Sequence, residues 1–165
     1  MEWKRNAEVI FLRNFICQIF QKGIHPDWAD FQNKYGGRWV IEWKEQDLRC
    51  KDDVDSHWME ILFILIGEHG DPYNDIVNGA VIQVKKNKFR IGVWLKVGLF
   101  FLNNAWSIMN TYCQQVYKNE AAVRHIGKLV KERLGLRFNI PFQVHGEEQN
   151  STSKRGSKNM ARITV

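Results

Sequence analysis

The sequence has too few cysteines, too widely spaced, for a disulfide framework or a zinc site. Its three cysteines, Cys17, Cys50 and Cys113, are odd in number, and its five histidines include no pair at metal-ligand spacing. Isolated cysteines of this kind are typical of free thiols in a reducing compartment. We therefore predict a cytoplasmic protein with no disulfide, no bound metal and no cofactor.

The sequence also lacks an apolar run of membrane-spanning length. The stretch Val9–Phe20 is interrupted by Arg13 and Asn14, and the apolar run 97–102 ends at Asn103. A transmembrane helix needs about 20 consecutive apolar residues, and a secretory signal needs an unbroken apolar centre. We therefore expect no membrane span, no signal peptide and no membrane partner.

Sequence motifs of the common enzyme classes are absent as well. No predicted strand leads into a glycine-rich phosphate loop, and no nucleophile and base occur in a recognisable catalytic pattern. The order of strands and helices shows no parallel βαβ signature and no internal repeat. We therefore predict a protein that binds a ligand or partner and is not an enzyme.

The composition is typical of one globular domain with a mild preference for anionic partners. The chain has 165 residues, 44% hydrophobic and 25% charged, which is enough to bury a core in a single domain spanning 1–165. Its formal net charge of +6 favours polyanions, although such a charge also occurs on ordinary soluble surfaces. The seven tryptophans are many for this length, and we expect some in the core and a few as stacking platforms.

Residue periodicity predicts an α+β fold built on an antiparallel sheet. The expected strands are Arg38–Trp43, Gly79–Val84, Lys88–Leu95, Phe138–Val144 and Arg162–Val165. The expected helices are Asp52–Gly67 and Asn119–Leu134. Pro141 favours an edge position for its strand, because proline cannot donate a ladder hydrogen bond. Residues 1–21 show no clear period, and the polar, basic residues 146–161 are predicted to form a flexible loop.

Two apolar stripes run along the helix expected over 52–67. The stripe expected to face the core consists of Val54, Trp58, Ile61, Leu62 and Leu65. The second stripe lies well round the helix and consists of Met59, Phe63 and Ile66. A second stripe indicates either burial on both sides or a docking surface, and the spacing alone slightly favours burial on both sides.

Four sequence blocks resemble the initiation factor 4E family in order and approximate spacing. They are HPDWADFQNKYGGRWVIEW from His25, HWMEILFILIGEH from His57, NGAVIQVKKNKFRIGVWL from Asn78 and VRHIGKLVKERLGL from Val123. The resemblance implies a curved antiparallel sheet with helices on its convex face and a ligand site on its concave face. The family's first strands and first helix, with one of its two cap-stacking tryptophans, are expected to be missing, since residues 1–20 do not resemble them and contain only Trp3.

The resemblance implies that the chain binds capped mRNA, through 7-methylguanosine triphosphate, in translation initiation. Methylated guanine is cationic and is attracted by aromatic faces, whereas the phosphates need lysine or arginine. The positions implied to bind the cap are Trp28, Asp30, Lys85, Lys88, Arg90, Trp94 and Lys154. Without the resemblance, the residues alone favour a core tryptophan beside a turn over a ligand-binding one at Trp28, and a solvated charged face at Lys85 and Arg90. The three tryptophans assigned to structure are Trp39, Trp43 and Trp58.

Departures from the family pattern predict weakened cap affinity. Ala29 stands where the family has the glutamate that reads guanine, and Asp30 beside it would need a shifted loop to replace that glutamate. Asn87 stands where the family often has a third basic residue. Residues 97–114 are an apolar insertion, which is compatible with a retained intron in an aberrant gene product or with a lineage-specific loop.

The second apolar stripe also has a counterpart in the family. Met59, Glu60 and Phe63 match the face that docks partners carrying a Tyr-x4-Leu-hydrophobic motif, such as a scaffold initiation factor or a repressor. The resemblance therefore favours a docking surface over burial on both sides. It also leaves an alternative function open, that of a regulatory interaction protein that binds initiation-factor partners without effective cap recognition.

Overall fold

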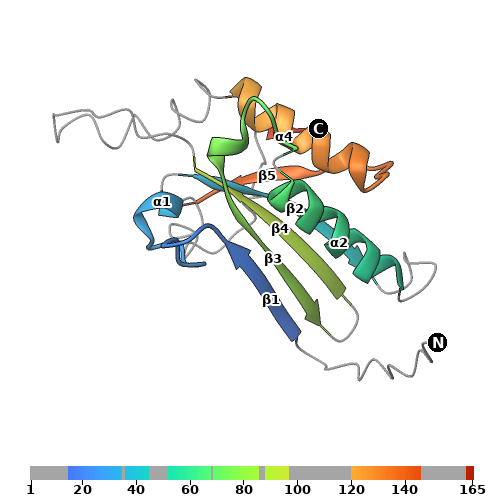
Figure 1. Cartoon of the computed structure of the whole chain (residues 1–165). Helices are drawn as coiled ribbons and strands as arrows, with labels where there is room; N and C mark the ends of the chain where they lie inside the picture. Colours follow the sequence, from blue (N-terminus) through green and yellow to red (C-terminus); the bar gives the residue numbers. More distant parts are fainter. Residues whose placement is uncertain are drawn as a thin grey trace, which may run out of the picture.

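The computed structural model describes residues 15–34, 36–44, 52–67, 69–85, 88–96, 120–145 and 163–165, and these form an α+β domain (Figure 1). All strand pairs are antiparallel, and the strand order is β1-β3-β4-β2-β5-β6. The strands are β1 Phe15–Phe20, β2 Gly37–Lys44, β3 Val77–Lys85, β4 Lys88–Leu95, β5 Pro141–Val144 and β6 Ile163–Thr164. The helices are α1 Phe31–Lys34, α2 Asp52–Ile66, the 3-10 helix η2 Asn74–Ile76 and α4 Glu120–Arg133. The predicted fold class is confirmed.

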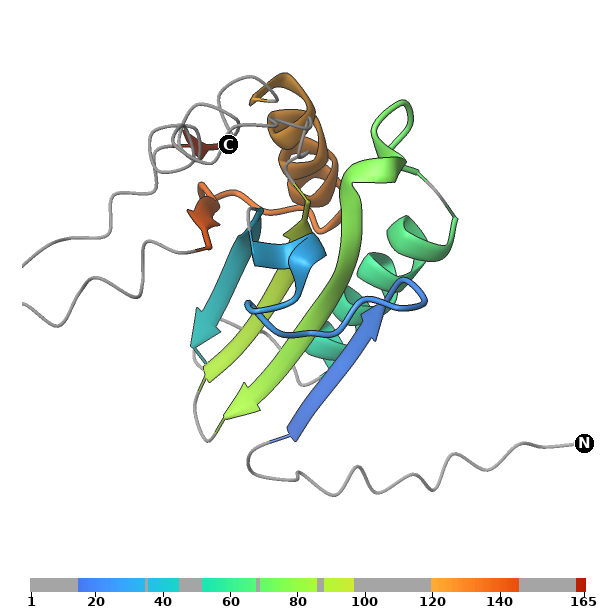
Figure 2. The same ribbon diagram turned by 90° about the vertical axis from the view of Figure 1, so that its left-hand side faces the viewer.

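The two long helices, α2 and α4, cover the same face of the curved sheet (Figure 2). Figure 2 shows the short helix α1 and the segment 21–30 on the side of the sheet opposite α2. Side chains alternate along β4, so that Phe89 and Ile91 point into the helix-covered core while Lys88 and Arg90 lie on the other face. We call this second side the open face.

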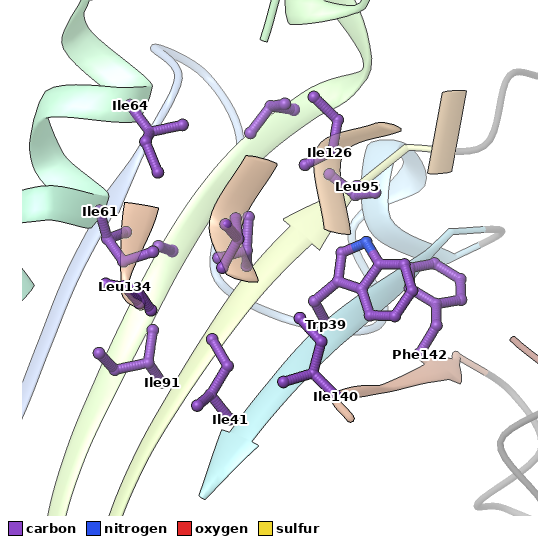
Figure 3. Close-up of a cluster of buried hydrophobic side chains, with 14 of the residues drawn as sticks. Trp39, Ile41, Ile61, Ile64, Ile91, Leu95, Ile126, Leu134, Ile140 and Phe142 are labelled. Atoms are coloured by element: carbon purple, nitrogen blue, oxygen red, sulfur yellow. The ribbon is translucent and has the colours of Figure 1, made fainter. Parts of the chain in front are cut away.

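The core between the sheet and the two helices is centred on Trp39 (Figure 3). Its side chain is 0% exposed, and its indole Nε1–H donates to the Val123 carbonyl oxygen over 3.0 Å. Its ring also lies 5.2 Å from that of Phe142. A Cβ on Gly127 would come within 2.4 Å of the Trp39 ring, so glycine at this position lets α4 approach the sheet closely. The assignment of Trp39 and Trp43 to the core is confirmed.

Two expectations about strands are corrected by the structure. Residues Phe15–Phe20 form β1, which pairs with β3 at one edge of the described sheet, although the sequence shows no clear period there. Only Cys17 and Ile19 of β1 pack against the core, so the apolar alternation is weak. The edge position predicted from Pro141 is wrong, because β5 lies between β2 and β6. Pro141 is tolerated there because it lies one residue beyond the last residue that pairs with β2.

The second apolar stripe of α2 is exposed, so burial on both sides is wrong for this helix. Met59, Phe63 and Ile66 are 46%, 53% and 70% exposed. The core side instead uses Val54, Ile61 and Ile64, of which Ile64 was not among the residues predicted for the core. The partly buried members packed against that core are Trp58 and Leu65. Among the described elements, the sheet packs against only one side of α2, which leaves the stripe on the other side exposed (Figure 1).

Several sequence predictions fall on residues outside the described ranges. These are the insertion at 97–114, the loop at 146–161 with Lys154, and the first part of the segment 1–21. In the part of the chain that the structure describes, no helix has the length and apolarity needed to cross a membrane. No group of three or more histidine, cysteine, aspartate or glutamate side chains gathers as a metal site in those same ranges.

Candidate nucleotide-binding site

Two tryptophans predicted to bind the ligand meet at one end of the open face. Trp94, near the end of β4, is 3% exposed, and its ring lies 5.6 Å from Phe20 and 4.5 Å from His145. Trp28, in the segment between β1 and α1, is half-buried and stacks on His145 with ring centroids 5.6 Å apart. His145 therefore lies in contact with both tryptophans, and we call Trp28, Trp94 and His145 the aromatic cluster.

Arg38 completes this end of the site and was not among the residues predicted from the sequence. Its guanidinium carbon lies 5.0 Å from the Trp28 ring centroid and 5.7 Å from that of Trp94, within the range of a cation–π contact. Its Nε and Nη2 donate to Gln143 Oε1 over 3.4 and 3.2 Å. The signal that could have identified it is the register of β2 and β4, which places Arg38 directly opposite Trp94.

The segment between β1 and α1, which carries Trp28, is held in shape by hydrogen bonds from its polar side chains to backbone groups. Asp30 Oδ2 accepts from the His25 N–H and Oδ1 from the Gln32 N–H. These hydrogen bonds lower the pKa of Asp30, and the one from the His25 N–H has the largest effect. Asn33, fully buried, donates through Nδ2 to the carbonyl oxygens of His25 and Asp27. The carboxylate of Asp30 thus shapes the segment beside Trp28, and Ala29 contributes no hydrogen-bonding side chain.

A cavity of about 310 Å³ lies between this segment and the open face. Its lining comes from all four long strands and from the segment between β1 and α1, and consists of Ile16, Gln18, Pro26, Trp28, Arg38, Val40, Val81, Gln83, Arg90, Gly92 and Trp94. Three predicted residues, Trp28, Arg90 and Trp94, are therefore brought together, whereas Asp30 does not line the cavity. Among the described residues, the lining holds two cations, Arg38 and Arg90, and no carboxylate, so the cavity suits an anionic or aromatic ligand.

The other predicted cations lie further along the same face. Lys85, Lys88 and Arg90, with Gln83, line a small hollow of about 30 Å³. Lys85 and Lys88 lie opposite each other where β3 and β4 meet at their hairpin. We call Lys85, Lys88 and Arg90 the basic cluster.

Glu42 on β2 neutralises part of the basic cluster, which the sequence did not predict. Its Oε2 accepts from Arg90 Nε over 2.7 Å and from Arg90 Nη2, and its Oε1 lies 2.8 Å from Lys88 Nζ. Partial burial opposes ionisation of Glu42, but the hydrogen bonds and charges of Lys88 and Arg90 outweigh it and lower the pKa of Glu42. Glu42 is therefore an anion at neutral pH.

His145 is kept neutral beside the two tryptophans. Burial lowers the pKa of His145 to about 4, and the positive charge of Arg38 acts in the same direction. The hydrogen bond to the Asn33 carbonyl oxygen raises the pKa but does not outweigh burial. Nδ1 lies 2.7 Å from that carbonyl oxygen, so Nδ1 carries the hydrogen and donates it. Across the described residues, neither His145 Nε2 nor Trp94 Nε1 has a hydrogen-bond partner. Within the aromatic cluster, His145 Nε2 is therefore an acceptor, and the Trp94 Nε1–H a donor, that no described residue uses.

The fold and the site together define a binding protein of the α+β class whose open sheet face combines aromatic rings with basic side chains. Residues 12–160 match the family model described as eukaryotic initiation factor 4E, and the chain belongs to that family. The match starts within the segment expected to diverge, and it runs through the insertion at 97–114.

Curated relatives and solved structures agree with this assignment. The chain is 38% identical to human eukaryotic translation initiation factor 4E over 149 residues, covering 89% of this chain and 58% of that protein. The Xenopus laevis protein of the same name is 36% identical, with 89% and 59% covered. The chain therefore spans less than two thirds of the length of these relatives.

Among solved structures, schistosome eIF4E complexed with m7GpppG and 4E-BP superposes with a TM-score of 0.65 at 28% identity, covering 91% of this chain and 69% of that one. Ascaris suum eIF4E-3 in complex with an m2,2,7G cap superposes with a TM-score of 0.67 at 24% identity, covering 91% and 68%. The second likeness concerns the fold alone.

Proposed function

We propose that this chain binds the 7-methylguanosine cap of mRNA in translation initiation, as a cytoplasmic binding protein without a catalytic step. The observation that carries the proposal is the cavity that brings Trp28 and Trp94 together with Arg90 on the open face. Several relatives are translation initiation factors, and the schistosome neighbour was solved with a cap dinucleotide. The base would bind at the aromatic cluster and the phosphates at the basic cluster.

The chemistry of the cavity favours cap binding that is weak and only modestly selective for methylation. A cationic base gains from the π faces of Trp28 and Trp94, but the Arg38 guanidinium already lies over both rings. No carboxylate of the described part of the chain lines the cavity to accept from the guanine Watson–Crick edge, and both Asp30 oxygens accept backbone N–H groups. Asp30 therefore supports the binding segment, and Lys85 and Lys88 extend the phosphate site beyond Arg90.

Calorimetric titration with m7GTP and with GTP tests this proposal. We expect both nucleotides to bind, with m7GTP preferred by less than about tenfold, or about 1.4 kcal/mol, because the Arg38 guanidinium already makes the cation–π contacts that would distinguish the methylated base. Binding of neither nucleotide would refute the proposal. A preference of a hundredfold or more would mean that another group reads the base.

We also propose that the exposed stripe of α2 binds a helical segment with a Tyr-x4-Leu-hydrophobic motif, from a scaffold initiation factor or a repressor. Met59 and Phe63 lie one helical turn apart and, with Ile66, form an exposed apolar surface next to the carboxylate of Glu60. Such a surface is typical of a protein-binding site. The schistosome neighbour was solved with a 4E-BP. Glu60 would pair with a basic residue of the partner.

Phe63→Ala is expected to weaken binding of such a peptide by about tenfold, because truncation of an interface anchor costs more than about 1 kcal/mol. The free energy of unfolding should change by less than about 0.5 kcal/mol, since Phe63 is 53% exposed and separate from the core side of α2. Fluorescence anisotropy with a labelled peptide measures the affinity. Phe31→Ala, an exposed phenylalanine on the other side of the sheet, is the matched control. Equal peptide affinities of the Phe63 variant and the unchanged protein would exclude this surface as the docking site.

A further inference from the structure

We propose that Glu42 is an internal counterion that competes with ligand phosphates for Lys88 and Arg90 and thereby lowers the affinity of this site for polyphosphates. The inference rests on the proposed function in one respect, the placement of the cap phosphates at the basic cluster. It adds a residue that sets how strongly the site discriminates a triphosphate from a monophosphate.

The strand register brings the carboxylate to the cations. Glu42 lies directly opposite Arg90 across the β2–β4 pair, and Lys88 is two residues earlier on the same face of β4. Each oxygen of Glu42 is used by a different cation: Oε1 lies 2.8 Å from Lys88 Nζ, and Oε2 accepts from Arg90 Nε over 2.7 Å. Donors that could bind phosphate are therefore directed at the carboxylate.

The charges of the cluster show what this contact does to a ligand. Lys85, Lys88 and Arg90 provide three positive charges around the small hollow, and Glu42 cancels one of them. The side chains of Lys88, Arg90 and Glu42 are between 35% and 45% exposed, so a ligand can reach them. Exposed ion pairs are weak, so a polyphosphate can displace the carboxylate, but the negative charge of Glu42 then stays beside the phosphates.

The position of the Glu42–Arg90 ion pair along the sheet predicts which ligands are affected by Glu42. Arg90 is four residues from Trp94 on β4, which is about 13 Å along a strand. A base held at the aromatic cluster would need a phosphate chain to reach Arg90 and Lys88. The effect of Glu42 should therefore grow with the number of phosphates. If Glu42 instead served to hold Arg90 in a productive position, removal of the carboxylate would weaken polyphosphate binding.

Glu42→Gln removes the charge and keeps the shape of the side chain. We expect it to tighten binding of m7GTP and of inorganic tripolyphosphate by about tenfold, with less than about twofold change for m7GMP. Glu132→Gln, which removes the same charge from an exposed position on α4 away from the site, is the matched control and should change none of these affinities. Glu42→Thr, a substitution compatible with a strand, is a second variant with the same expected result should the glutamine variant fold poorly.

The two probes separate this inference from the proposed function. Tighter tripolyphosphate binding without any m7GTP binding would refute cap recognition and support the counterion role. Tripolyphosphate affinity that is unchanged or weaker in both Glu42 variants would overturn the counterion role, whether or not m7GTP binds.

Discussion

Trp28→Ala is expected to weaken m7GTP binding by about tenfold to a hundredfold, because one base–aromatic stack contributes about 1–3 kcal/mol. Trp28 lines the cavity and is only half-buried, so its ring can face a ligand. Its present neighbours, His145 and the Arg38 guanidinium, hold it in place without covering it completely. Calorimetry is the appropriate measurement, because it does not depend on the fluorescence that Trp28 itself contributes.

Phe63→Ala is the reciprocal control for this variant. Phe63 is exposed on the side of α2 that faces away from the sheet, so Phe63→Ala should weaken peptide binding and leave m7GTP affinity unchanged. Trp28→Ala should weaken m7GTP binding and leave peptide affinity unchanged. A Trp28 variant that binds m7GTP as tightly as the unchanged protein would show that the base does not stack there.

Trp39→Ala is expected to lower the free energy of unfolding by about 3–5 kcal/mol, the usual cost of truncating a buried large aromatic residue. Trp39 is fully buried, packs on Phe142 and donates its indole N–H to the Val123 carbonyl. Gly127, which lies against the Trp39 ring, has no side chain of its own to occupy the space that the ring would leave. Urea unfolding followed by circular dichroism measures the change.

Trp28→Ala is the matched control for stability. The same substitution at a half-buried tryptophan on the open face should cost less than about 1 kcal/mol. A loss at Trp39 no larger than the loss at Trp28 would contradict the assignment of Trp39 to the centre of the core. The pair of variants thus separates a tryptophan that stabilises the fold from one that binds a ligand.

Elements with a strong local pattern were predictable from the sequence. The alternation over Lys88–Leu95 predicted a strand that has those bounds in the structure, and the helical spacing after Asp52 predicted α2 to within one residue at its end. Local alternation and helical spacing decide which side of an element is apolar. The same reasoning separated the two stripes of α2, but it could not decide whether the second was covered.

The residues that were missed depend on contacts between distant segments. β1 has little apolar alternation, and it is a strand because β3 supplies its hydrogen bonds. Arg38 and Gln143 are 105 positions apart, and His145 and Asn33 are 112 apart. Glu42 looks like any polar residue of an alternating strand until the register places it opposite Arg90.

By itself, the sequence determined the fold class and most helices and strands, because these follow from periodicity. Motifs within short segments carried the family resemblance, and that resemblance gave the candidate ligand residues Trp28, Arg90 and Trp94. Only the tertiary structure decided that Arg38 and His145 lie in contact with the two tryptophans, that Glu42 neutralises Lys88 and Arg90, and that the second stripe of α2 is exposed. The physical reason is that strand register and packing, which no local pattern encodes, set the distances between charges and rings from different strands.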